Sequence, residues 1–293
     1  MKPCRFTYVA PSSLDETVQA LTSWGADACK LLAGGQSLGP LLNLRLSNPE
    51  VVIDLDGVKE LGGTPTCDDF GISLPAMSRQ RSIELNRTVA EVCPLITQAL
   101  PFVAHRTIRN RGTIGGSLAH SDPAAELPAV ALANNAEFVA FGPHGERRIP
   151  ASEFFQGYFT TALAADEILW SIGFARQVNG MGSAWVEFAP RHGDFAIVGV
   201  AAELKIDGAG VIESARLAYS GIADTPWRNN QVDDTLVGER ARVGVYRAAA
   251  RIASTSCHPP ADLVGTTAYR QHLVRVLTVE ALALATTRAR AHK

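Results

Sequence analysis

The hydrophobic positions in the first 58 residues fall into three short runs and one helical repeat. The runs, which are typical of buried strands, stand at residues 5–11, 30–33 and 51–55. Between the first two runs, apolar side chains recur at helical spacing at Leu14, Val18 and Leu21. Ser13 and Glu16 form a capping-box sequence before this repeat, and Gly25 follows it as a helix stop. The pattern predicts a small α/β unit at about residues 1–58.

The next part of the chain alternates between strand-like and helix-like segments. Strand patterns stand at 70–77, 137–141 and 167–174. Two prolines divide the apolar stretch 83–104 into short helices. Asp122 followed by Pro123 is a good N-cap and first-turn pair, so we expect a packed helix from residue 123 to about 134.

The pattern changes beyond a polar, glycine-bearing linker at 176–183. Two long strand candidates flank the hairpin sequence DGAG at 207–210, and two helices follow them. These four elements are expected at 196–206, 211–222, about 239–255 and about 268–290. A strand group followed by helices is typical of an α+β region.

Composition and charge limit the classes of function. Of the 293 residues, 46% are hydrophobic and 19% charged, which is enough apolar material for two domain cores. The net charge of −2 predicts no general attraction to nucleic acid or to anionic membranes. No apolar run reaches ~18 residues, and the first residues lack the apolar region of a secretion signal. We therefore expect a cytoplasmic protein without a transmembrane segment.

The cysteines give no sign of a metal centre. They are scattered at Cys4, Cys29, Cys67, Cys93 and Cys257. Their odd number argues against a disulfide framework, and none has the C-x-x-C spacing of zinc or iron–sulfur ligands. We expect no metal ligands in this chain.

Two glycine pairs are the strongest candidates for a ligand-binding site. Residues 33–37 (AGGQS) follow a predicted strand, and residues 113–117 (TIGGS) lead toward the predicted helix at 123. Glycine permits close backbone approach and positive φ, and successive N–H groups can then enclose an anion. Neither pair belongs to a G-x-G-x-x-G fingerprint or a P-loop. Each alone is more often a plain turn, whereas together they suggest two walls of one diphosphate site.

Charged residues near the second glycine pair have ordinary explanations as well as functional ones. A solvated face is the simpler explanation for the arginines, which are Arg106, Arg109 and Arg111. Capping or surface positions explain His105 and His120. Glu126 is either a first-turn acid stabilised by the helix dipole or a ligand contact. Nothing nearby forms a Ser/His/Asp or Cys/His arrangement, so no catalytic residue is assigned.

Three motifs in order carry a resemblance to a known family. They are AGGQSLGPLLNLRL at 33–46, RNRGTIGGSLAHSDPAAELPAVALA at 109–133 and PRHGDFAIVGVAAEL at 190–204. With them, nearly the whole chain resembles the FAD-binding medium subunit of bacterial molybdenum hydroxylases. This is the xanthine dehydrogenase and aerobic carbon monoxide dehydrogenase family.

The resemblance implies an α+β fold in two domains. Residues 1–176 would form a two-part FAD-binding domain of the type shared with p-cresol methylhydroxylase and vanillyl-alcohol oxidase. Its subdomains would be about 1–58 and 59–176. Residues 177–293 would form a smaller α+β domain like the C-terminal domain of the carbon monoxide dehydrogenase flavoprotein.

The resemblance also implies contacts with FAD. One wall of the diphosphate site would consist of Ala33, Gly34, Gly35, Gln36 and Ser37. The facing wall would consist of Thr113, Ile114, Gly115, Gly116 and Ser117. Glu126 stands where relatives have an acid near the adenosine or the flavin. The strand 183–191 would pass the flavin ring, with Trp185 or Glu187 as candidate neighbours.

The role implied by the resemblance is electron transfer. A separate large molybdopterin subunit would hydroxylate the substrate, which is an N-heterocycle, a purine, an aldehyde or carbon monoxide. A small subunit would carry two 2Fe–2S clusters and deliver electrons to FAD in this chain, which would pass them to an external acceptor. The three subunits would form a heterotrimer, and two heterotrimers would form a dimer. Two alternatives stay open. A self-sufficient flavin oxidase or reductase predicts turnover by the isolated chain, and a scaffold that has lost FAD predicts a colourless protein.

Overall fold

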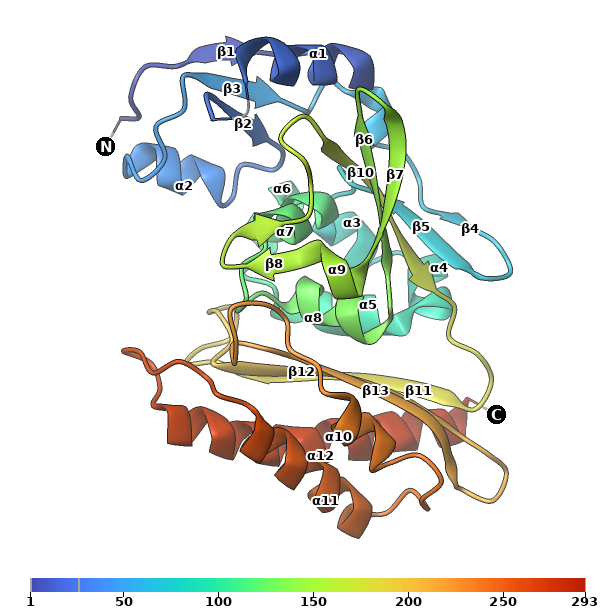
Figure 1. Cartoon of the computed structure of the whole chain (residues 1–293). Helices are drawn as coiled ribbons and strands as arrows, with labels where there is room; N and C mark the ends of the chain where they lie inside the picture. Colours follow the sequence, from blue (N-terminus) through green and yellow to red (C-terminus); the bar gives the residue numbers. More distant parts are fainter. Residues whose placement is uncertain (1, 26, 293) are drawn as a thin grey trace.

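The computed structural model describes residues 2–25 and 27–292 of the chain. The chain runs through three layers in sequence order, an N-terminal unit, a middle region and a C-terminal region (Figure 1). The mixture of helices and sheets confirms the expected α+β class.

No helix in the described part of the chain combines the length and the hydropathy needed to cross a bilayer.

The N-terminal unit is a small parallel sheet packed against one helix. Its strands pair in the order β1-β3-β2 and are β1 (Thr7–Val9), β2 (Cys29–Leu32) and β3 (Val51–Asp54). Apolar residues of α1 (Leu14–Trp24) share a buried core with Val51 and Ile53 of β3. The Ser13 hydroxyl accepts a hydrogen bond from the Glu16 N–H (3.2 Å), which confirms the predicted helix start. The short helix α2 (Leu38–Asn43) follows the first glycine pair.

The middle region is built on an antiparallel sheet with the order β4-β5-β10-β6-β7. Its strands are β4 (Thr66–Cys67), β5 (Gly71–Pro75), β6 (Glu137–Gly142), β7 (Gly145–Pro150) and β10 (Ile168–Ala175). The strands predicted at 70–77, 137–141 and 167–174 are confirmed. The edge strand β7 was not predicted, because its sequence GERRIP has no apolar alternation.

Short helices connect β5 with β6. They are α3 (Gln80–Glu84), α4 (Arg87–Val92), α5 (Pro94–Ala99), η2 (Leu100–Phe102), α6 (Arg106–Arg111), α7 (Ile114–His120) and α8 (Glu126–Ala133). The division of 83–104 into short helices is therefore confirmed. The remaining short elements of this region are η1 (Lys59–Leu61), α9 (Ala151–Phe154), β8 (Phe155–Gly157) and β9 (Thr160–Thr161).

The C-terminal region is a three-stranded antiparallel sheet backed by helices. Its elements are β11 (Met181–Phe188), β12 (Val198–Ile206), β13 (Ile212–Ser220), α10 (Asn230–Asp234), α11 (Val243–Ser256) and α12 (Thr267–Ala291). The predicted hairpin and both long helices are confirmed. The linker expected at 176–183 is shorter, because β11 already begins at Met181.

The two faces of this sheet belong to different cores. Val186, Val200 and Tyr219 lie in the core formed with α11 and α12. Trp185 and Ala201, one position away along their strands, lie in the core of the middle region, because successive side chains of a strand point to opposite faces.

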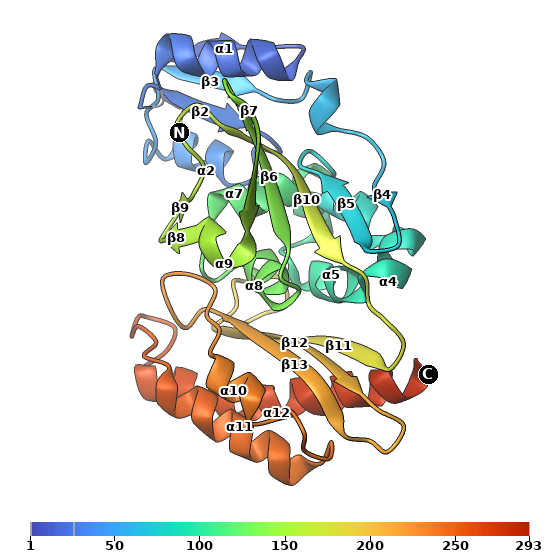
Figure 2. The same ribbon diagram turned by 45° about the vertical axis from the view of Figure 1, so that its right-hand side comes forward.

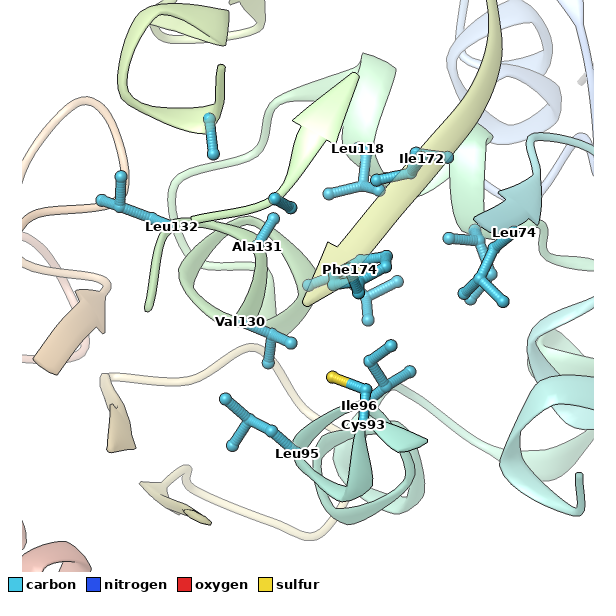
Figure 3. Close-up of a cluster of buried hydrophobic side chains, with 14 of the residues drawn as sticks. Leu74, Cys93, Leu95, Ile96, Leu118, Val130, Ala131, Leu132, Ile172 and Phe174 are labelled. Atoms are coloured by element: carbon cyan, nitrogen blue, oxygen red, sulfur yellow. The ribbon is translucent and has the colours of Figure 1, made fainter. Parts of the chain in front are cut away.

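Helix α8 lies where the middle and C-terminal regions meet. Every residue of α8 is buried, as expected for a helix packed on all sides. It contacts α5 on one side and β12 and β13 on the other, and Figure 2 shows α5 and α8 between the two sheets. Side chains of α8, α5 and β10 converge there, including Val130, Leu95 and Phe174 (Figure 3).

The start of α8 differs from the prediction. A helix from residue 123 with Asp122 as N-cap was expected, but α8 begins at Glu126 with Ala125 as N-cap. Residues 122–125 form a turn instead, in which the Asp122 carboxylate accepts from the Ala124 N–H (2.9 Å). The Pro123 carbonyl, which a helix would have used internally, accepts a hydrogen bond from Gly221 N–H at the end of β13 (2.8 Å). A tertiary contact therefore prevails over the local helix-start signal.

Candidate functional site

The first glycine pair forms a turn directly after β2. Gly35 has a φ of 71°, which favours glycine at this position. Gly34 lies against the end of α6, since a Cβ atom added to it would be 2.2 Å from the Arg111 carbonyl oxygen. The Gln36 side chain donates to the Gly34 carbonyl (2.9 Å) and so folds back on its own turn. We call residues 33–37 the first wall.

The second glycine pair is not an open loop, as the sequence suggested, but the first turn of α7. Thr113 is the N-cap, and its hydroxyl accepts from the Gly116 N–H (3.0 Å). Gly115 packs against the chain after β5, where an added Cβ would lie 2.5 Å from the Ala76 Cβ. We call residues 113–117 the second wall.

The fold brings the two walls together, although they are far apart in the sequence. A Cβ added to Gly116 would lie 3.4 Å from the Ala33 Cβ, so the walls are in contact there. Arg79 also joins the N-terminal unit to the middle region. Its guanidinium pairs with Asp56, which follows β3, and donates to the Arg111 carbonyl at the end of α6 (2.5 Å). Nothing in the local sequence around Arg79 distinguishes it from other surface arginines, so this contact was not predicted.

The walls differ in their free hydrogen-bond donors. Among residues 2–25 and 27–292, no acceptor is found for the backbone N–H groups of residues 35–38. In the second wall, by contrast, the N–H groups of residues 114–117 all donate within the chain, to Ser78, Ala76 and Thr113. The open donors are therefore on the first wall. They fit an anionic diphosphate, which accepts hydrogen bonds from successive backbone N–H groups.

Side-chain hydroxyls remain available on both walls. The hydroxyls of Ser37 and Ser117 have no hydrogen-bond partner in the described part of the chain. The Thr113 hydroxyl already accepts a bond from Gly116. The second wall thus offers a braced backbone and one free hydroxyl rather than a set of N–H donors.

The solvated face expected for the arginine cluster is confirmed for Arg106 and Arg111 but is wrong for Arg109. Arg109 is only 6% exposed. Its guanidinium donates to Glu84 (2.8 Å) and to the carbonyl oxygens of Val103 and Ala104 (2.9 and 2.8 Å). It therefore ties α6 to α3, whereas Arg106 and Arg111 are exposed.

The two histidines lie at helix ends, in line with the ordinary explanation given for them. His105 is exposed at the N-cap position of α6, without a capping hydrogen bond from its side chain. His120 is half-buried at the end of α7, with its ring centroid 5.0 Å from that of Phe159. Burial lowers the pKa of His120. Neither ring has a hydrogen-bond partner in the described residues that would mark it as a catalytic base.

Two acids lie at the junction of the middle and C-terminal regions. Glu126, the first residue of α8, is 5% exposed, and burial raises its pKa to about 8, with a further increase from the charge of Glu187. Burial also raises the pKa of Glu187 to about 7, opposed by a hydrogen bond from Trp185 Nε1 (3.0 Å). Trp185 itself is buried in the core of the middle region.

A cleft of about 640 Å³ opens at the same junction. It is lined from the middle region by residues including Asp122, Pro123 and Phe159, and from the C-terminal region by residues including Asp194, Phe195 and Gly221. Its volume is in the range of small-molecule sites. In the described residues, no group of three or more His, Cys, Asp or Glu side chains is arranged to hold a metal ion.

Family models cover most of the chain. Residues 4–174 match the FAD binding domain in molybdopterin dehydrogenase. Residues 183–285 match the CO dehydrogenase flavoprotein C-terminal domain.

Relatives of known name match over the full length. The 6-hydroxypseudooxynicotine dehydrogenase complex subunit alpha of Paenarthrobacter nicotinovorans is 36% identical, over 100% of this chain and 98% of its own length. The carbon monoxide dehydrogenase medium chain of Hydrogenophaga pseudoflava is 34% identical, over 96% of this chain and 97% of its own.

Solved structures have the same fold. A chain of carbon monoxide dehydrogenase from Hydrogenophaga pseudoflava superimposes with a TM-score of 0.95 at 35% identity, covering 98% of this chain and 99% of that chain. A chain of quinoline 2-oxidoreductase from Pseudomonas putida 86 gives a TM-score of 0.93 at 33% identity, covering 99% of both.

Proposed function

The chain belongs to the family of FAD-binding medium subunits of molybdenum hydroxylases, and from this premise we propose how it works. It is the FAD-carrying electron-transfer subunit of an oxidoreductase complex. It receives electrons from an iron–sulfur subunit and passes them through FAD to an external acceptor, while a separate molybdopterin subunit hydroxylates the substrate. The observation that carries this proposal is the row of free N–H groups at residues 35–38, opposite a braced second wall.

The FAD diphosphate would lie between the two walls. Gly35, Gln36 and Ser37 would donate to it from the first wall, and the Ser117 hydroxyl would do so from the second. The other proposed contact residues, which shape the walls, are Ala33, Gly34, Thr113, Ile114, Gly115 and Gly116. Glu126 would face the flavin end of the cofactor, because it lies at the junction near β11.

When bound, FAD supplies the redox chemistry, and the chain's residues bind and orient it. The Thr113 hydrogen bond fixes the shape of the second wall, and Arg79 links the end of α6 to Asp56 of the N-terminal unit, so little reorganisation is needed on binding. The chain therefore needs no nucleophile or metal ligand of its own.

The domain division and the assembly are part of the same proposal. Residues 1–176 would form the FAD domain, with subdomains at about 1–58 and 59–176, and residues 177–293 would form the C-terminal domain. Three clusters of buried side chains support this division, although Trp185, Ala201 and Ala218 join the middle cluster and Ile168 joins the N-terminal one. A small subunit with two 2Fe–2S clusters and a large molybdopterin subunit would complete a heterotrimer that dimerises in the cytoplasm.

Co-purification tests this proposal. The tagged chain, expressed with its chromosomal neighbours, should carry FAD and bring down an iron–sulfur protein and a molybdopterin protein. Those partners and the flavin spectrum would exclude the scaffold alternative, and dependence of turnover on the large subunit would exclude the self-sufficient oxidase. A folded chain that takes up no FAD, either alone or with these partners, would show that the proposal is wrong.

A further inference from the structure

One buried arginine, Arg270, holds the C-terminal side of the cleft together. It lies near the start of α12 and is 4% exposed. One terminal nitrogen of its guanidinium donates to the carbonyl oxygens of Ile197 (2.5 Å) and Gly221 (2.8 Å). The other terminal nitrogen donates to the Asp262 carboxylate (2.6 Å). The segments before β12, after β13 and before α12 each supply lining residues of the cleft, and all three meet at this planar group.

The backbone beside this guanidinium is packed too closely for a side chain at Gly221. Gly221 has a φ of 78°, and an added Cβ would lie 2.5 Å from the Ile197 carbonyl oxygen. The two carbonyl groups that Arg270 binds therefore belong to segments in direct contact. On the third segment, the Asp262 carboxylate also accepts from two backbone N–H groups of its own turn (3.0 Å each). Each of the three acceptors is thus held at a fixed place.

Burial of Arg270 is unfavourable unless its hydrogen bonds are used. A guanidinium loses its hydration when it is buried. The Nε–H of Arg270 has no acceptor in the part of the chain that the structure describes. An apolar side chain could fill the same space without these two costs. The hydrogen bonds of the terminal nitrogens, rather than packing, are therefore what the fold gains from this residue.

The hydrogen bonds continue from Gly221 into the middle region. The Gly221 carbonyl accepts from Arg270, while its N–H donates to the Pro123 carbonyl (2.8 Å). Pro123 lies in the turn 122–125, which is closed by a hydrogen bond of 3.1 Å between its end residues. Glu126 follows this turn as the first residue of α8. Gly221 therefore joins the two sides of the cleft, and Arg270 holds Gly221.

We infer that Arg270 is a positioning residue for the flavin end of the FAD site. Through Gly221 and Pro123, it fixes the turn 122–125 and the start of α8 relative to the C-terminal side of the cleft. This role rests on the proposed function, in which the flavin end of FAD lies at this junction. The hydrogen bonds of Arg270 do not involve the first or the second wall, so it acts on one end of the cofactor only.

Titrations of the full chain with FAD and with ADP test this role. ADP carries a diphosphate but no flavin, so it can occupy the walls without reaching the junction. We expect Arg270→Gln to weaken FAD binding about 5-fold, as for one lost hydrogen bond, and to leave ADP binding unchanged. A general loss of stability would weaken both ligands alike. The visible circular dichroism of bound FAD should also change in this variant, because it depends on the surroundings of the flavin ring.

Arg270→Lys separates the geometry of the side chain from its charge. Lysine keeps the charge but lacks the planar fork that reaches three acceptors at once. We therefore expect Arg270→Lys to lose FAD affinity and keep ADP affinity, as Arg270→Gln does. If Arg270→Gln does not fold, the comparison of the two ligands is made with Arg270→Lys.

The matched control is Arg288→Gln, on the same helix. Arg288 also joins the C-terminal region to the middle region, because it donates to the Gln98 side chain of α5 (2.6 Å) and to the Ser183 carbonyl of β11 (2.8 Å). It lies about 27 Å further along α12 than Arg270, at ~1.5 Å per residue. Arg288→Gln should lower the free energy of unfolding and leave the ratio of FAD to ADP affinity unchanged.

Amide hydrogen exchange of the FAD-free full chain tests the link itself. In the wild type, the Gly221 N–H should be protected, because it is bonded to Pro123. Arg270→Gln should speed exchange at Gly221 and in the turn 122–125, whereas Arg288→Gln should not. The wild-type measurement needs neither a cofactor nor a variant, so misfolding of a variant cannot hide an unprotected Gly221.

Three results would overturn the inference. They are an unprotected Gly221 in the wild type, an equal change of FAD and ADP affinity in the Arg270 variants, and the same difference between the two ligands in Arg288→Gln. The proposed function fails in a different way. A wild-type chain that binds neither FAD nor ADP overturns it together with the role of Arg270, whereas tight FAD binding with equal effects on both ligands overturns the role of Arg270 alone.

Discussion

The first and second walls contain the same glycine pair followed closely by a serine, yet their backbones are used differently. In the first wall, Gly35 adopts a positive φ and the following N–H groups have no acceptor in the described chain. In the second wall, each N–H from Ile114 to Ser117 is already bonded, and Gly115 is fitted against Ala76. One wall keeps its donors open, and the other uses its hydrogen bonds to fix its shape.

This difference indicates how a chain can build a diphosphate site from two distant segments. Open donors supply affinity, but a turn with open donors has few internal bonds to hold it in place. The contact of Gly34 with the Arg111 backbone and the contact of Ala33 with Gly116 place the first wall against the rigid second wall. Substitutions in each wall can therefore separate the two roles.

The largest effect is expected from Gly34→Ala. The added Cβ would lie 2.2 Å from the Arg111 carbonyl oxygen, which is backbone and cannot rotate away, so the first wall must move. We expect the FAD affinity to fall by at least about 10-fold, or about 1.4 kcal/mol, in a flavin-binding titration. The free energy of unfolding should also fall, by about 1–3 kcal/mol.

The matched control is Gly39→Ala. A Cβ at Gly39 meets nothing within 4 Å, and this glycine lies within α2. Alanine is the better helix former, so stability should be unchanged or slightly higher and FAD affinity unchanged. Equal FAD affinity in the two variants would mean that contact between the walls does not position the donors.

A smaller effect is expected from Thr113→Val, which removes the N-cap of α7. The Gly116 N–H loses its acceptor, so the free energy of unfolding of the FAD-free chain should fall by about 1 kcal/mol in chemical denaturation. FAD affinity should change less, because this hydroxyl braces the second wall. Thr255→Val in α11 is the control, since its exposed hydroxyl only bonds back to its own helix.

The outcome of Thr113→Val also shows whether Thr113 has a structural role or contacts FAD directly. If FAD affinity fell while the stability of the FAD-free chain stayed the same, Thr113 would act as a direct ligand. The second wall would then supply affinity as the first wall does.

The smallest effect is expected from the two serines. Ser37→Ala and Ser117→Ala each remove a hydroxyl without a protein partner, so stability should stay within experimental error. Each should weaken FAD binding by about 0.5–1.5 kcal/mol, as expected for one lost hydrogen bond. An unchanged affinity in Ser117→Ala would leave the second wall with a purely structural role.

The sequence predicted the strands around these walls, but not the helices α2, α6 and α7 that contain or adjoin them. Apolar runs identified β2, β3, β5 and β10, because a buried strand needs a continuous apolar or alternating pattern whatever its partners are. Ser13 and Glu16 identified the start of α1, because a capping hydrogen bond depends only on residues close in the sequence. The glycine pairs were also visible, since few other residues tolerate a close backbone approach.

Local signals failed where distant segments compete for the same atoms. Asp122 and Pro123 look like a helix start, but the Pro123 carbonyl accepts from Gly221, directly after β13, and α8 begins only at Glu126. Arg109 looks like a surface charge, but Glu84 and two carbonyl groups hold it inside. No local pattern reports such partners.

By itself, the sequence determined which residues can form each wall, because glycine, serine and an apolar strand impose local requirements on the backbone. Only the tertiary structure decided that the walls meet, which N–H groups stay open, and that Glu126 is buried at the junction. The reason is physical, since the availability of a donor and the pKa of an acid depend on every atom nearby. In this protein, those atoms come from segments far apart in the chain.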